Sequence, residues 1–309
     1  MEPILQVKDL SISFTQYGRG TRQVLLPVIQ DLSLTIRPGQ VVAVVGSSGS
    51  GKSLLAHGIL GILPYNSHMA GEITFLGQPL TPKRAEAVRG KEIVLVPQGV
   101  TYLDPLMKVG PQIRKGRRDQ KARQASRTAL KRYGLGEEVE SLYPFELSGG
   151  MARRVLIATA AAETPKLVIA DEPTPGLDAR SAQRVLGHFR ELADGGAGVL
   201  LITHDLELAL TIADRVAVFY AGETVEEADA ADFAAGKLRH PYTRALWNAL
   251  PQNGFVPIPG AQPSPGEVGK GCPFAPRCPK QRPQCLSPVS YREFEGGLVR
   301  CLYPEGEMV

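Results

Sequence analysis

Cysteine is missing from the first 271 residues of this 309-residue chain. The four cysteines that it does have, Cys272, Cys278, Cys285 and Cys301, all lie near the C-terminal end. Four residues scattered at random would rarely gather in so short a segment, so the group indicates one shared site rather than separate core thiols. In a reducing compartment such a cluster is more often a metal or iron–sulfur site than a disulfide framework.

Long hydrophobic runs are also absent. No stretch approaches roughly 18 consecutive apolar residues, so we expect no membrane span. Residues 1–9 carry acids where a secretory leader would be basic, and no apolar segment follows them. We therefore expect the chain to stay in the cytoplasm. With 43% hydrophobic and 21% charged residues the composition is that of a globular protein, and a net charge of +4 is too small to indicate nucleic-acid binding.

Three short apolar runs predict the buried strands of an α/β core. They cover residues 41–45, 167–170 and 199–202, and helical segments separate them. The first run leads directly into a Gly/Ser loop and a helix that begins near Lys52. The length of the chain predicts about two domains.

The remaining segments are less regular. Residues 4–14 partly alternate apolar and polar side chains, which predicts a half-exposed strand, and 15–23 predict a hairpin loop before a second strand near 32–36. Residues 109–147 include a basic stretch and are interpreted as a mostly helical insertion. The proline- and glycine-rich segment 253–271 predicts a linker or an irregular wrap.

Residues 46–53 read Gly-Ser-Ser-Gly-Ser-Gly-Lys-Ser and match the phosphate-loop pattern G-x-x-x-x-G-K-[ST] in full. Glycines let the backbone N–H groups turn toward phosphate oxygens at the start of a helix. Lys52 would contact the β and γ phosphates, and the Ser53 hydroxyl would bind Mg²⁺. The predicted ATP-binding residues are Gly46, Ser47, Ser48, Gly49, Ser50, Gly51, Lys52, Ser53 and Leu54.

Two acids end the apolar run 167–170, at the edge where open α/β sheets bind ligands. Asp171 would hold Mg²⁺ directly or through water. Glu172 would polarise the attacking water as a general base. Together with the phosphate loop, this pair predicts a nucleotide-hydrolysing site.

Residues 147–151, Leu-Ser-Gly-Gly-Met, resemble the LSGGQ signature of ABC-type ATPases. Around them the other landmarks of that family occur in order. Gln98 resembles the glutamine of the Q-loop, which would also approach Mg²⁺, Asp178 resembles the aspartate of the D-loop, and His204 resembles the switch histidine. The resemblance implies an α/β P-loop cassette with a helical subdomain at about 99–155, in which Glu172, His204 and Gln98 are catalytic.

The same resemblance implies roles for the signature and for an aromatic residue. Ser148, Gly149, Gly150 and Met151 would close over the ATP bound by another subunit. Met151 replaces the common glutamine, as in the peptide and nickel importer branch. Phe14 or Tyr17 would stack on the adenine ring.

The C-terminal part also resembles that branch. Residues 240–246 and 271–279 are similar to the C-terminal extension of oligopeptide/dipeptide importer ATPases. We therefore expect an ATPase domain at 1–237 and an irregular extension at 238–309. Relatives with this extension are thought to carry a [4Fe–4S] cluster, which fits the wide spacing of the four cysteines and the prolines that follow two of them. A structural zinc site, unmetallated thiols or a disulfide remain alternatives.

The resemblance implies an ATP- and Mg²⁺-dependent subunit of a bacterial-type importer, bound peripherally at the cytoplasmic side of the inner membrane. It would pair with a second ABC ATPase subunit, which is expected to be a homologous heterodimer partner. It would also drive two transmembrane permease subunits, docked near Gln98 and residues 102–105, and indirectly serve an extracytoplasmic solute-binding protein. The solute would be an oligopeptide or dipeptide, nickel or a metal chelate.

Two other classes of protein share parts of this pattern. A soluble ABC ATPase that acts on nucleic acid or ribosomes usually has two cassettes in one chain or a long coiled-coil insertion, and neither is visible here, so no nucleic-acid partner is expected. An inactive cassette would lack Lys52, Asp171, Glu172 or His204, and all four are present.

Overall fold

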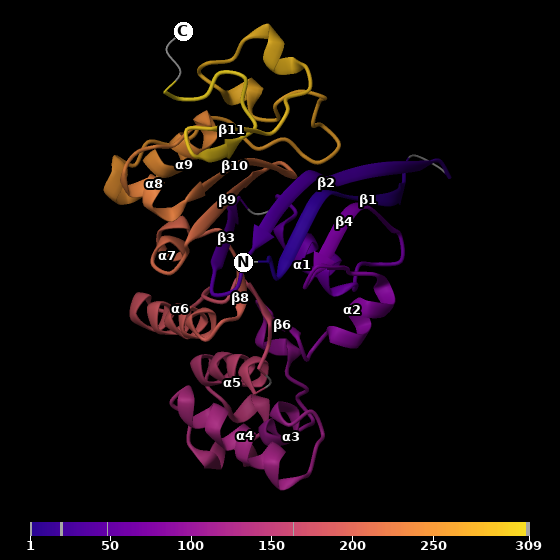
Figure 1. Ribbon diagram of the computed structural model, residues 1–309, viewed down its shortest axis with the longest axis vertical. Coiled ribbons are helices and arrows are strands. Elements are labelled where there is room, and N and C mark those ends of the chain that lie inside the picture. The colour runs from indigo at the N-terminus through magenta and orange to yellow at the C-terminus, as the bar shows by residue number, and fades with distance from the viewer. Residues whose placement is uncertain (1, 19–20, 48, 163, 307–309) are drawn as a thin grey trace.

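The computed structural model describes residues 2–18, 21–47, 49–162 and 164–306 and contains two β-sheets. The smaller sheet is antiparallel in the order β2-β1-β4-β5. The larger sheet has the order β11-β12-β10-β9-β3-β8-β7-β6. Figure 1 shows the smaller sheet beside the larger one, with helices α6 and α7 on the other side.

The strands are β1 (Leu5–Tyr17), β2 (Gln23–Ile36), β3 (Val41–Gly46), β4 (Ser67–Phe75), β5 (Gln78–Pro79), β6 (Ile93–Val96), β7 (Leu167–Asp171), β8 (Gly198–Thr203), β9 (Arg215–Tyr220), β10 (Glu223–Asp229), β11 (Arg292–Phe294) and β12 (Gly297–Val299). The α-helices are α1 (Lys52–Leu60), α2 (Pro82–Val88), α3 (Val109–Ile113), α4 (Gln120–Arg132), α5 (Gly149–Ala161), α6 (Ala179–Asp194), α7 (Leu206–Leu210), α8 (Ala230–Ala234) and α9 (Pro241–Asn248). Short 3₁₀ turns cover Val100–Tyr102, Glu137–Ser141, Pro144–Glu146, Pro251–Asn253, Ala275–Arg277 and Pro283–Leu286.

The centre of the larger sheet is formed by the three apolar runs that the sequence predicted as strands. β3 lies between β8 and β9 and is parallel to both, and β8 pairs with β7 in the same direction. Val41, Ala43 and Val45 face one hydrophobic core, while Val42 and Val44 face the other. Burial on both faces explains why β3 is apolar throughout instead of alternating.

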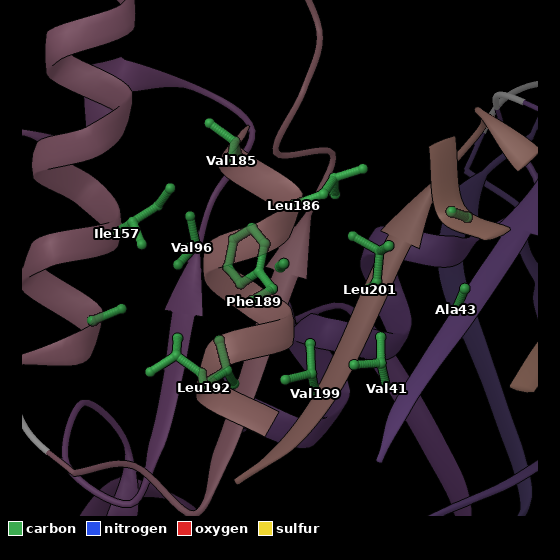
Figure 2. Packing of buried hydrophobic residues seen from close by; sticks show 14 of the residues in the cluster. Val41, Ala43, Val96, Ile157, Val185, Leu186, Phe189, Leu192, Val199 and Leu201 are labelled. Carbon is green, nitrogen blue, oxygen red and sulfur yellow. The ribbon is translucent and has the colours of Figure 1, made fainter. Parts of the chain in front are cut away.

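Phe189 of α6 occupies the middle of the first core. Figure 2 shows its ring among Val96, Ile157 and Leu201, which come from β6, α5 and β8. The second core lies between the two sheets and includes residues of β1, β2 and α1. The two cores hold the strand ends that carry the predicted site on a rigid platform.

The helical insertion is confirmed, and in Figure 1 it forms the lower end of the molecule. There α4 packs on α5, and Asp119 caps α4 through a 2.8 Å hydrogen bond from the Ala122 amide. The basic residues of α4 lie mainly on its solvent face, as expected for a solvated helix.

The C-terminal segment differs from the sequence-based expectation in one respect. As the sequence predicted for this proline- and glycine-rich segment, residues 254–274 contain no helix or strand. The hairpin β11–β12, which the sequence analysis missed, then pairs with β10, so that Glu226 lies opposite Val299. The extension therefore continues the sheet that also contains β3.

Candidate nucleotide site

A cavity of about 420 Å³ brings together residues from several segments of the chain. Its lining combines the loop before α1 with side chains that follow β6, β7 and β8. The residues are Val28, Gly49, Gly51, Lys52, Ser53, Leu54, Gln98, Glu172 and His204. Most of these were predicted as site residues, and the structure gathers them at one edge of the larger sheet.

The phosphate loop has little room for a side chain at either of its two end glycines. A Cβ on Gly46 would lie 2.4 Å from the carbonyl oxygen of Phe219, and one on Gly51 would lie 3.0 Å from the side chain of Ile29. Gly49 and Gly51 have φ angles of +79° and +91°, which favour glycine. Ser48 lies outside the described residues.

The ammonium group of Lys52 is buried in this loop. Its Nζ donates to the carbonyl oxygens of Gly46, at 2.8 Å, and Ser47, at 2.9 Å. Burial lowers the pKa of Lys52 below its ordinary value. The nearby carboxylates of Glu172 and Asp171 offset this only in part. The charge is thus placed inside the loop whose backbone would surround the phosphates.

Asp171 and Ser53, which were predicted to hold Mg²⁺, are in direct contact. The Ser53 hydroxyl donates to Asp171 Oδ1 at 3.2 Å, and Ser53 and Gln98 line the same cavity. Burial raises the pKa of Asp171, and the hydrogen bond from Ser53 lowers it. Hydroxyl, carboxylate and amide oxygens suit Mg²⁺, so the donor set fits this ion.

Glu172 and His204 are in direct contact. His204 Nδ1 lies 2.8 Å from Glu172 Oε2, so the residue that follows β8 orients the carboxylate that follows β7. Only 8% of Glu172 is exposed, and its side chain reaches the cavity from a left-handed backbone with φ +47°. A buried carboxylate beside an imidazole can polarise a water molecule.

Arg153 is a residue of this region whose contacts the sequence analysis missed. From α5 its guanidinium donates to the carbonyl oxygens of Glu172, at 3.2 Å, and Gln98, at 3.1 Å. It also reaches Pro173, at 2.6 Å, and Pro175, at 3.5 Å. The available signal was an arginine one helical turn before the apolar residues Leu156 and Ile157, since a buried arginine needs partners.

The signature residues lie outside this cavity. Ser148 caps α5, and its hydroxyl accepts a hydrogen bond from the Met151 amide at 3.3 Å. A Cβ on Gly149 or Gly150 would meet no atom within 4 Å, so the helix start faces open space. Met151 packs against the first core, and Asp178 caps α6 by accepting from the Ser181 amide at 3.0 Å. Hydrogen bonds from Ser181 lower the pKa of Asp178.

The two candidate aromatic residues have different surroundings. Phe14 packs against the second core, whereas Tyr17 is 73% exposed at the end of β1. Neither lines the 420 Å³ cavity. Which of them contacts a nucleotide stays a prediction.

The cysteine cluster is supported only in part. All four cysteines line one small apolar cavity, together with His240. They are free thiols, and burial raises the pKa of Cys272 to about 12 and that of Cys301 to about 11. Among the described residues, no group of three or more His, Cys, Asp or Glu side chains is arranged to hold a metal ion. The structure thus brings the four partly buried sulfurs to one cavity, but the residues it describes show no metal-binding arrangement for the predicted [4Fe–4S] cluster or for the zinc alternative.

Comparison with known proteins decides the family. The profile described as ABC transporter matches residues 29–175, and that described as oligopeptide/dipeptide transporter, C-terminal region, matches 225–285. The oligopeptide transport ATP-binding protein OppD of Escherichia coli is 35% identical over 100% of this chain and 95% of that protein. The chain belongs to the ABC transporter family.

Other ABC proteins agree with this assignment. OppD of Mycobacterium bovis is 38% identical over 93% of this chain, which spans about half of that relative, 49%. The dimeric structure of a bacterial ABC transporter cassette superposes with a TM-score of 0.63 at 25% identity and covers 73% of this chain and 98% of that one. The predicted α/β P-loop cassette of an ABC ATPase is therefore confirmed. In the described part of the chain, no helix has the length and apolar character needed to cross a membrane.

Proposed function

We propose that this chain is the ATP-hydrolysing subunit of a peptide importer. The observation that carries the proposal is the single cavity in which Lys52, Ser53, Gln98, Glu172 and His204 meet. Family membership supports the importer class, since the OppD relatives are named for oligopeptide transport. We propose that residues 1–237 form the ATPase domain and that residues 238–309 form the extension.

The residues of the cavity would divide the reaction between them. Lys52 and the loop amides would bind the β and γ phosphates of ATP. Ser53, Asp171 and Gln98 would hold Mg²⁺, which neutralises phosphate charge when bound. Glu172 would take the proton of the attacking water, and His204, 2.8 Å from its carboxylate, would orient it.

A second ATPase subunit would complete the site. The exposed start of α5, with Ser148, Gly149 and Gly150, lies outside the chain's own cavity, which suits a contact to ATP held by another subunit. Asp178 would lie at the same contact. The partner would be a homologous ATPase chain.

The surface that follows Gln98 is a candidate contact for the two permease subunits. Tyr102 is 65% exposed, Leu106 88% and Met107 41%, and all three follow the Q-loop closely. Apolar side chains gathered on a surface mark protein contacts more often than solvent faces. The chain would then act at the cytoplasmic side of the inner membrane and serve a solute-binding protein only indirectly.

Oligopeptides or dipeptides are the proposed solutes. The C-terminal profile and the relatives named above refer to peptides, and nothing in them supports nickel or metal chelates. The comparisons do not favour the alternative of a soluble ABC ATPase that acts on nucleic acid.

The four cysteines are proposed to bind a [4Fe–4S] cluster. The support is that Cys272, Cys278, Cys285 and Cys301 share one cavity, and that four thiolates are the ligand set of such clusters. A zinc ion would need the same thiols.

Lys52→Ala tests the proposed ATP site. The substitution removes a charge that contacts phosphate in the ground state, so the affinity for ATP should fall at least about tenfold. Calorimetric titration of the purified chain with Mg-ATP measures this, and Lys83→Ala, at an exposed lysine of α2, is the matched control. If the affinity of the Lys52→Ala variant for ATP were unchanged, the phosphate loop would not be the ATP-binding site.

A further inference from the structure

The C-terminal extension contacts the phosphate loop directly, at Ser47. The Ser47 hydroxyl donates a hydrogen bond to Oε1 of Gln262, in the irregular segment after α9. Tyr242, in the first turn of α9, is the other neighbour: burial raises the pKa of its hydroxyl to about 12, and the adjacent side chain and backbone of Ser47 lower it. One loop residue thus has two partners that lie about 200 positions later in the sequence.

Ser47 also connects these partners to the group that would bind phosphate. Its carbonyl oxygen accepts from Lys52 Nζ at 2.9 Å and from the Ser50 amide at 3.3 Å. The middle of the loop has no such anchor, since a Cβ on Gly49 would meet nothing within 4 Å. Ser47 is therefore the point at which side chains outside the loop hold it.

Both partners of Ser47 are themselves firmly held. Only 3% of Tyr242 is exposed, and its ring centroid lies 4.4 Å from that of Tyr220 and 5.3 Å from that of Phe274. The segment that leads to Gln262 is fixed by Arg277, which donates to the carbonyl oxygens of Pro259, at 2.7 Å, and Gly260, at 3.0 Å.

Arg277 ties this segment to the ATPase domain as well. Its Nη1 lies 2.9 Å from the hydroxyl oxygen of Tyr220, at the end of β9, and β9 pairs with β3 immediately before the phosphate loop. The segment that contains Gln262 and the start of the phosphate loop at Gly46 are therefore both attached to β9.

We propose that Gln262 and Tyr242 are positioning residues that hold the phosphate loop in its anion-binding conformation through Ser47. The proposal rests on ATP binding at this loop. A loop that is held in its bound conformation before the ligand arrives loses less entropy on binding, so these contacts should act on ATP affinity. Saturating ATP would restore the conformation, so the turnover number should change little.

Gln262→Met and Tyr242→Phe test the proposal on the full chain. Each removes one polar group and keeps the shape of the side chain. Each should raise the Kd for Mg-ATP about three- to tenfold, the range for one neutral hydrogen bond. In the assembled transporter, the KM for ATP should rise while kcat stays near its wild-type value. Gln284→Met, an exposed glutamine of the same extension, is the control and should leave the Kd unchanged.

A double-mutant cycle with Ser47→Ala separates positioning from general stability. Once the Ser47 hydroxyl is gone, Gln262→Met should have no further effect on the Kd. Additive effects, or a fall in the unfolding temperature of the nucleotide-free chain that accounts for the weaker binding, would overturn the proposal. Unchanged Kd in both single variants would overturn it while leaving the proposed function intact, whereas a wild-type chain that does not bind ATP would overturn both.

Discussion

At the scale of single residues, Glu172 combines three unusual features. Its backbone is left-handed with φ +47°, it is 8% exposed, and its carboxylate contacts His204. A left-handed conformation costs a residue with a side chain about 1 kcal/mol or more, and such strain persists where the surrounding structure determines it. Here the 2.8 Å bond from the Glu172 amide to the Ile202 carbonyl oxygen keeps the turn in place.

Glu172→Gln should preserve ATP binding and lower turnover by about 10²-fold or more, because the amide keeps the shape of the side chain but cannot take a proton. ATP hydrolysis by the assembled transporter and nucleotide titration of the purified chain measure the two effects. Glu86→Gln, which changes an exposed carboxylate of α2 in the same way, is the comparison. A mutant that hydrolyses ATP at the wild-type rate would show that the base lies elsewhere.

Arg153→Gln should lower both stability and turnover. The guanidinium joins α5 to the carbonyl oxygens after β6 and β7, and losing charge-assisted hydrogen bonds should reduce the free energy of unfolding by about 2–3 kcal/mol. Arg154→Gln is the matched control, because Arg154 donates instead to Tyr133 and Gly134 in the helical insertion. Urea unfolding should show a loss in both variants. If the turnover of ATP fell equally in both variants, the loss would not come from the contacts that Arg153 makes with the segments after β6 and β7.

The residues of the cavity were predictable because their chemistry requires particular neighbours. Lys52, Asp171 and Glu172 follow apolar strands that are buried on both faces, and His204 and Gln98 were identified through resemblance. The bonds of Arg153 and of Ser47 could not be predicted, because each joins segments whose spacing in the sequence follows no period.

At the scale of elements, β10 connects the ATPase domain to the extension. Its Glu226 is fully buried, and Arg239, 1% exposed, lies 3.3 Å from that carboxylate. The guanidinium also donates to the Phe294 carbonyl oxygen in β11, at 2.8 Å. The sequence analysis missed β10 as well, because β10 reads Glu-Thr-Val-Glu-Glu-Ala-Asp and its burial depends on the hairpin that pairs with it.

The start of β10 predicts a pH dependence of stability. Burial raises the pKa of Glu223 to about 7, with Arg300 lowering it and Asp31 raising it further. Between the ordinary value of 4.5 and about 7, the folded chain holds a proton that the unfolded chain has lost. The free energy of unfolding should therefore fall as the pH rises through this window.

Glu223→Gln should flatten that decline, because its side chain does not titrate. Urea unfolding at several pH values across the window and above it measures the slope, with Glu293→Gln, on exposed β11, as the control. An equally steep decline in the Glu223→Gln variant would assign the pH dependence to other groups.

At the scale of the whole molecule, the cysteine loop is part of the structure that carries the ATP site. Cys272 and Cys278 pack against the first core, and the Cys272 amide donates to the Cys285 carbonyl oxygen at 2.8 Å. The sequence analysis placed the cysteines in an extension next to the ATPase domain, and the contacts of Arg277 and Gln262 join that extension to the ATP site.

The proposed [4Fe–4S] cluster predicts that protein purified without oxygen is brown and contains about four iron and four sulfide per chain. Cys278→Ser should lose the iron, because it removes one of four thiolate ligands. Iron and sulfide analysis with absorbance spectra measures both, and Ser287→Ala, in the same segment, is the control. A colourless preparation with about one zinc per chain would favour a zinc site instead.

The central position of β3 has a consequence for how the chain is made. Val41 pairs with Val199 and Val42 with Arg215, so the strand before the phosphate loop gains both neighbours only after most of the chain has been synthesised. Pairings between residues so far apart in sequence form slowly. Until then the apolar strand stays exposed on the ribosome, where it is prone to aggregation. The nascent chain should therefore depend on chaperones late in its synthesis, and its folding should be completed only when the final hairpin emerges and pairs with β10.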